Sequence, residues 1–133
     1  MKHFLNTQDW SRSELDALLT QAARDGASDI HIEPRREQGT VRFRIDGVLH
    51  NVYQFPPQVT MAVVSRLKSL GRMNVAEKRK PQDGRLKTRT PKGQETELRL
   101  STLPTAFGEK LVMRIFDPEV LVRSFQQLGF EGH

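Results

Sequence analysis

The chain has no cysteine among its 133 residues, which excludes a disulfide framework and a thiolate metal site. It also lacks any apolar run near the roughly 18 residues of a membrane-spanning helix, and polar residues follow residues 1–5 too soon for a signal peptide. The sequence has one tryptophan, one tyrosine and no aromatic stacking array, and it has no RNP-like or zinc-finger pattern typical of nucleic-acid binding. We therefore expect neither a membrane span nor a nucleic-acid partner.

Self-contained catalytic signatures are missing as well. The phosphate-binding loop G-x-x-x-x-G-K-[ST] is absent, and its nearest fragment, residues 108–110, lacks the upstream glycine and the following hydroxyl. No G-x-S-x-G nucleophile turn occurs either. We expect the chain alone to hydrolyse no ATP and to contain no complete nucleotide site.

The composition suits one modest domain with a basic surface. Hydrophobic residues make up 36% of the chain, which is enough for one core. Lysine and arginine number 21 against 16 acidic residues, giving a formal net charge of +5. Such a surplus suits an anionic partner, either phosphates or an acidic protein face, and it is equally common on a surface that meets only water.

Helical and extended segments can be told apart by their apolar periodicity. A capping box at Ser11 and a glycine stop at Gly26 predict a helix over 12–25, and apolar spacing predicts a second helix over 58–71. Asp46-Gly47 is a strong hairpin signal, whereas the polar residues 74–84 read as an irregular loop. Alternating patterns predict strands near 29–33, 41–45, 48–53, 86–90, 95–103 and 110–116.

The order helix, three strands, helix, three strands indicates an α+β fold. Short connections favour a mainly antiparallel sheet of about six strands with the helices packed on one face. We divide the chain into an N-terminal tail (1–10), the domain itself (11–118) and the start of a linker (119–133). The apolar face of the sheet is expected to hold Phe43, Ile45, Leu98, Leu100, Leu111, Met113 and Ile115.

Two arginines in the second expected strand form a first candidate site. Arg42 and Arg44 lie two apart, so their side chains share a face and repel each other unless an anionic group lies nearby. That group is either an external anion or partner domain, or an internal carboxylate such as Asp29, Glu33 or Asp46.

A histidine in the first expected strand is a weaker candidate. His31 and Glu33 share one face and could begin a metal site, but no other histidine supplies a spacing pattern. We therefore expect a hydrogen-bonded surface histidine and no metal.

The basic segment 78–85 is predicted to end in a tight turn. Asp83 can bond the backbone two residues on, and Gly84 can adopt a positive φ. Such a turn, with Arg79 and Arg85 beside it, can present backbone N–H groups and cations to a phosphate, although it can also serve only to reverse the chain.

Arg99 and Arg114 each lie between apolar residues of a strand, so both should point away from the core. A planar, permanently charged group on a rigid strand suits a phosphate site. An ion pair with Glu97 or Glu109 is the simpler explanation, and on these residues alone we prefer it.

Four turn-rich signatures follow one another in the sequence, at residues 27–34, 42–49, 80–85 and 101–110. Together they resemble the domain just before the motor in the hexameric ATPases of type II secretion and type IV pilus assembly. The resemblance covers about residues 12–129, and Glu97 departs from it where the family often has aspartate. The matching segments are 27–34, 42–49, 77–79, 81–85, 98–105, 108–110, 113–117 and 128–129.

The resemblance implies a PAS-like domain that moves against the motor of a hexamer, where ATP and Mg²⁺ are bound by a motor that this chain lacks. It implies that Arg99 and Arg114 act as arginine fingers at the γ-phosphate. It places the protein on the cytoplasmic side of the bacterial inner membrane, with the motor, neighbouring subunits and the secretion or pilus platform as partners. The domain-contact candidates are Arg42, Arg44, Arg79, Asp83, Arg85, Glu109 and Lys110.

Two other functions stay open at this stage. The chain could be a stand-alone PAS-type sensor of a small anion, which an apolar pocket inside the sheet would favour. It could also be an adaptor that docks acidic proteins through a basic face. Arginines aligned on an exposed part of the sheet, without such a pocket, would favour the ATPase role.

Overall fold

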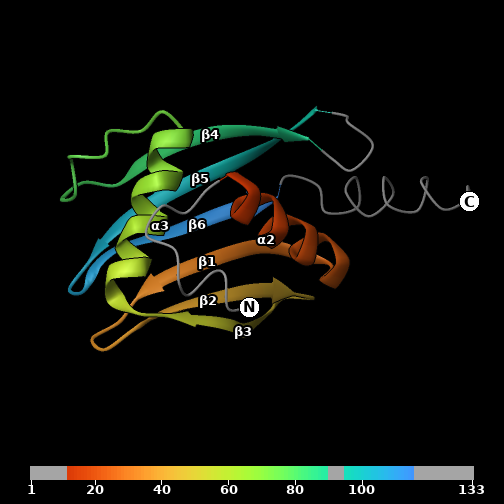
Figure 1. The fold of residues 1–133 in the computed structure, drawn as a ribbon, viewed down its shortest axis with the longest axis horizontal. Helices are drawn as coiled ribbons and strands as arrows, with labels where there is room; N and C mark the ends of the chain where they lie inside the picture. Colours follow the sequence, from red (N-terminus) through yellow and green to blue (C-terminus); the bar gives the residue numbers. More distant parts are fainter. Residues whose placement is uncertain (1–11, 90–94, 116–133) are drawn as a thin grey trace, which may run out of the picture.

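A computed structural model describes residues 12–89 and 95–115, and its elements follow the predicted order (Figure 1). The N-cap at Ser11, the turn at 91–93 and the segments 1–10 and 119–133 lie outside the described residues. The elements are α2 (Arg12–Asp25), β1 (Ala27–Pro34), β2 (Gly39–Ile45), β3 (Val48–Phe55), α3 (Pro57–Leu70), β4 (Gln82–Arg89), β5 (Glu95–Thr105) and β6 (Gly108–Ile115).

The six strands form one open sheet in the order β3-β2-β1-β6-β5-β4, and every neighbouring pair is antiparallel. Both helices cross the same face of this sheet, and β1 and β6 lie at its centre (Figure 1). The predicted α+β class, with helices on one face, is confirmed. Neither described helix is long and apolar enough to cross a membrane.

The core lies between the helices and the sheet. The apolar stripe of α2 and that of α3 are buried against it, from Leu15 to Ala23 and from Val59 to Leu67. On the sheet, six of the seven predicted core residues are buried, whereas Ile45 is only partly buried because it ends β2 beside the hairpin turn. That turn is formed as predicted, with φ of 53° at Asp46 and 81° at Gly47.

The prediction of a turn at Asp83-Gly84 is wrong. β4 already begins at Gln82, and its register with β5 pairs Asp83 with Ser101 and Gly84 with Leu100. Gly84 is needed for space, since an added Cβ would lie 2.6 Å from Cγ of Met73 and 2.8 Å from the carbonyl oxygen of Gly71. Close packing of the 71–73 segment, rather than a reversal of the chain, therefore explains this glycine.

Candidate anion-binding site on the open face of the sheet

The sheet face opposite the helices carries the predicted arginines. Arg99 is exposed between the buried Leu98 and Leu100, and Arg114 is exposed between the buried Met113 and Ile115. Strand alternation thus turns both guanidinium groups away from the core, as predicted.

Cross-strand register aligns these arginines with others. Arg85 of β4 pairs with Arg99, Arg99 pairs with Arg114, Arg114 pairs with Asp29 of β1, and Asp29 pairs with Arg44 of β2. We call these five residues the arginine row. It contains four cations and one carboxylate, all on rigid neighbouring strands.

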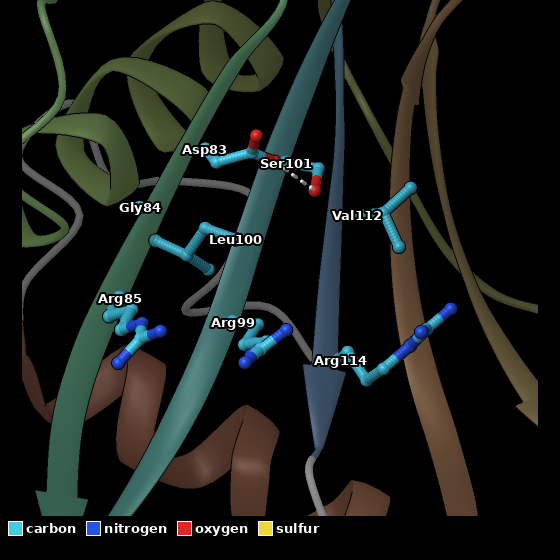
Figure 2. Close-up of a pocket in the computed structure, with 8 residues that line it drawn as sticks. All are labelled: Asp83, Gly84, Arg85, Arg99, Leu100, Ser101, Val112 and Arg114. Atoms are coloured by element: carbon cyan, nitrogen blue, oxygen red, sulfur yellow. Dashed lines mark hydrogen bonds between the residues drawn. The ribbon is translucent and has the colours of Figure 1, made fainter.

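A polar cavity of about 450 Å³ lies at the β4 to β6 end of the arginine row. Figure 2 shows Arg85, Arg99 and Arg114 side by side on three strands, with Asp83 and Ser101 beyond them. The hydroxyl of Ser101 donates a 3.0 Å hydrogen bond to the Asp83 carboxylate. The cavity therefore has three arginines at one end, and the hydrogen-bonded pair of Asp83 and Ser101 at the other.

Asp29 and Glu33 are the carboxylates that offset these cations at the centre of the sheet. Asp29 accepts a 3.1 Å hydrogen bond from Nε of Arg44, and its other oxygen lies 3.5 Å from Nε of Arg114. Glu33 lies 3.5 Å from Arg42 and 3.3 Å from Lys110. Arg42 and Arg44 thus have the internal partners that their spacing required.

The environment of Glu33 favours its charged form. Burial alone would raise the pKa of this carboxyl group, but a hydrogen bond and the charge of Lys110, with Arg35 and Arg42, lower the pKa below its ordinary value. Glu33 is therefore an ionised anchor for the cations around it.

The histidine between these carboxylates differs from the prediction. His31 is buried rather than on the surface, and neither ring nitrogen has a hydrogen-bond partner. Burial and the charge of Lys110 lower its pKa, although Asp29 and Glu33, 3.7 and 3.9 Å away, act in the opposite direction. Among the described residues, no group of three or more histidine or carboxylate side chains is arranged to hold a metal ion.

The other contact candidates are not all brought together. Arg85 lies 3.7 Å from Glu97, and Arg79 stands exposed in the loop before β4, 4.0 Å from Glu77. Glu109 points to the opposite side of the sheet, where its carboxylate is buried. Neither Arg79 nor Glu109 lines the cavity of the arginine row.

The partner of Glu109 is a residue that sequence reasoning missed. Lys68 of α3 is fully buried, and its Nζ donates to both Glu109 oxygens at 2.9 and 2.8 Å and to the Glu77 carbonyl at 2.8 Å. A signal was present, because Lys68 follows Leu67 directly and lies one turn beyond Val64, at the edge of the apolar stripe of α3.

Comparisons with known proteins agree with one another. The family model described as type II/IV secretion system protein matches residues 7–133. The chain is 69% identical over 130 residues to the type IV pilus assembly ATPase TfpB of Acinetobacter baylyi. The aligned region covers 98% of this chain and 21% of that protein. The chain is 47% identical over 116 residues to the type II secretion system protein E of Xanthomonas campestris pv. campestris, covering 87% of this chain and 20% of the relative. The chain thus spans about a fifth of the length of these relatives.

Proposed function

Because the chain belongs to the type II/IV secretion system protein family, we propose that it is the regulatory and coupling domain of a secretion or pilus-assembly ATPase. In this role it moves against the motor domain as ATP is bound and hydrolysed, and Arg99 and Arg114 reach the γ-phosphate. The whole protein acts as a hexamer on the cytoplasmic side of the inner membrane, where platform proteins receive the motion.

The observation that carries this proposal is the arginine row beside its polar cavity. Arg85, Arg99 and Arg114 are direct cross-strand neighbours, and like charges in that position repel each other. A polyphosphate bound between them removes the repulsion and accepts charge-assisted hydrogen bonds from the guanidinium groups. Negative charge that develops on the transferred phosphoryl group is then stabilised by donors that are already in place.

The residues fit the phosphate better than the metal of an ATP complex. The described part of the chain offers no group of three carboxylate or histidine side chains for Mg²⁺. We therefore assign the metal ligands, like the phosphate-binding loop, to the motor domain. This division makes the chain alone inactive and the arginines useful only when the two domains meet.

Substitution of the two arginines tests the proposal. In the full-length ATPase, Arg99→Ala and Arg114→Ala should each lower turnover about tenfold or more, which corresponds to about 1.4 kcal/mol of transition-state stabilisation. Arg24→Ala is the matched control, since Arg24 is an exposed arginine in the last turn of α2, away from the row. Normal turnover in both row variants, with intact folding, would refute the finger role.

Mixing experiments separate the ATPase role from the sensor. The chain should not hydrolyse ATP alone, and adding a separate motor domain should raise the rate of that motor. Tight nucleotide binding by the chain alone, without any effect on a motor, would favour the sensor instead.

Domain contacts are tested by a different variant. Arg42 lies two register positions from Arg44, opposite His31, and its guanidinium group is 3.5 Å from Glu33. We expect Arg42→Ala to weaken hexamer assembly more than it lowers turnover, as sedimentation and ATPase measurements on the same preparation would show.

A further inference from the structure

The segment from Ser28 to Glu33 lies at the centre of the sheet, yet the proposed function gives it no task. Asp29 in this segment is the carboxylate of the arginine row, and its side chain is only 10% exposed. A buried carboxylate is stable as an anion only when cations and donors surround it. Asp29 therefore needs the cations beside it, and its fixed position restricts where those cations can lie.

One side of Asp29 is held rigidly. Arg44 donates from Nε to Oδ2 of Asp29 and from Nη1 to the carbonyl oxygen of Gly47, both at 3.1 Å. The register of β1 with β2 shifts between Ala27 and Asp29, so Ser28 is an extra residue in β1, and its hydroxyl lies 3.5 Å from the Arg44 carbonyl oxygen. A bulge of this kind re-aims the side chains beside it. Here it brings Asp29 and Arg44 onto one face.

The other side of Asp29 faces Arg114. Oδ1 lies 3.5 Å from Nε of Arg114, and the two residues are direct cross-strand partners between β1 and β6. Among the described residues, Asp29 is the carboxylate that the structure pairs with Arg114, whose side chain is otherwise 66% exposed. A contact through Nε leaves the two terminal nitrogens of the guanidinium group for another anion.

We propose that Asp29 is a positioning residue, which holds Arg114 through Nε and leaves its two terminal nitrogens to bind the phosphate. This inference rests on the proposed function of Arg114. A long exposed arginine loses considerable rotamer freedom when it binds a phosphate, and an anchor that restricts it beforehand reduces that loss. The charge of Asp29 also offsets the repulsion between Arg114 and its neighbour Arg99.

Glu33 supplies a matched control. It lies four residues further along the same strand and face, its side chain is 13% exposed, and it pairs with Arg42 and Lys110 rather than with Arg114. Glu33→Gln removes a similarly buried charge from the same strand. A general loss of sheet stability should affect both variants, whereas loss of Arg114 positioning should affect only Asp29→Asn.

The test is a double-mutant cycle in the full-length ATPase. Asp29→Asn should lower kcat about fivefold in the wild-type background but less than about twofold when Arg114→Ala is already present, because the anchored group is gone. Glu33→Gln should instead change kcat by the same factor in both backgrounds. Asp29→Glu, which keeps the charge, should recover part of the lost kcat, and it replaces Asp29→Asn if circular dichroism shows that the amide variant does not fold.

The outcomes separate the two claims. Normal turnover in Arg114→Ala would show that the proposed function is wrong at this residue. If Arg114→Ala lowers turnover while Asp29→Asn does not, or lowers it equally in both backgrounds, the positioning role of Asp29 is wrong and the finger role stands. Where Asp29→Glu replaces Asp29→Asn, the positioning role is likewise wrong if Asp29→Glu lowers kcat by the same factor in the wild-type and Arg114→Ala backgrounds.

Discussion

Both faces of the sheet carry charged side chains, but these are buried on the helix side and largely exposed at Arg85 and Arg114 on the open side. On the helix side, Lys68 and Glu109 have side chains only 1% and 7% exposed, and Nζ of Lys68 is surrounded by acceptors from Glu109 and Glu77. On the open side, Arg85 and Arg114 are 63% and 66% exposed, and within the described part of the chain they lie 3.7 Å from Glu97 and 3.5 Å from Asp29. The buried pair has its donors and acceptors satisfied inside the protein, whereas the exposed cations keep donors that an outside anion can use.

Breaking the buried pair should have the largest effect. Lys68→Ala leaves the Glu109 carboxylate buried without its cation, and such a change typically costs about 3–5 kcal/mol of unfolding free energy. It also removes the donor to the Glu77 carbonyl, which ties the loop before β4 to α3. Urea denaturation of the variant and the wild type measures the difference.

A double variant serves as the control for this pair. Lys68→Met with Glu109→Gln removes both charges and keeps similar volumes, so it should be more stable than Lys68→Ala alone. If Lys68→Ala unfolds at the same urea concentration as the wild type, Glu109 does not need the Lys68 cation to remain buried.

Gly84→Ala should have the next largest effect, although Gly84 lies between two residues of the open face. A Cβ there would lie 2.6 Å from Cγ of Met73 and 2.8 Å from the Gly71 carbonyl, so about 1–3 kcal/mol should be lost to overpacking. Met73→Ala should cost less stability in the Gly84→Ala background than in the wild type, because there it also removes one of the two clashes. Unchanged thermal stability of Gly84→Ala would contradict the packing explanation.

His31 should make stability depend on pH. Its pKa is lowered in the folded state from an ordinary value of 6.5, so below pH 6.5 the unfolded chain binds more protons. Stability is therefore fully present above pH 6.5 and falls as the pH drops through the folded pKa. His31→Gln should remove this slope, and the melting temperature between pH 5 and 7 measures it. An identical slope in both proteins would exclude His31 as its source.

The exposed pair Arg85 and Glu97 should matter least to stability. Their side chains are 63% and 43% exposed and 3.7 Å apart, and such pairs contribute about 0–1 kcal/mol. Glu97→Gln should therefore change the unfolding free energy by less than about 0.5 kcal/mol, and less still in high salt. A loss as large as that of Lys68→Ala would show that the two faces do not differ as described.

Local patterns were sufficient for most of the fold. Alternation and helical spacing identified all the described elements, because the period of each element appears in its own residues. The exception is the start of β4, where Pro81, Asp83 and Gly84 are typical of a turn. Pairing with β5 and the contact with Met73 outweighed these local preferences. Neither interaction is visible in the residues of the turn motif itself.

The candidate site was predictable only in part. The residue types and the face of Arg99 and Arg114 follow from their own strands, and the charges of Asp29 and Glu33 marked them as possible partners. The buried position of His31 did not follow, because it depends on a central strand with neighbours on both sides. Lys68 was visible only as an irregularity in an apolar stripe, since Glu109 lies 41 residues away.

The amino-acid sequence thus determines the elements, their buried faces and the family, because these depend on neighbours within a few residues and on motifs in a fixed order. Which strands are adjacent, and in what register, depends on pairings between distant segments. That register sets Arg85, Arg99, Arg114, Asp29 and Arg44 in one line across the sheet. Tertiary structure alone converts scattered charges into a site, because cross-strand alignment is a property of the assembled sheet.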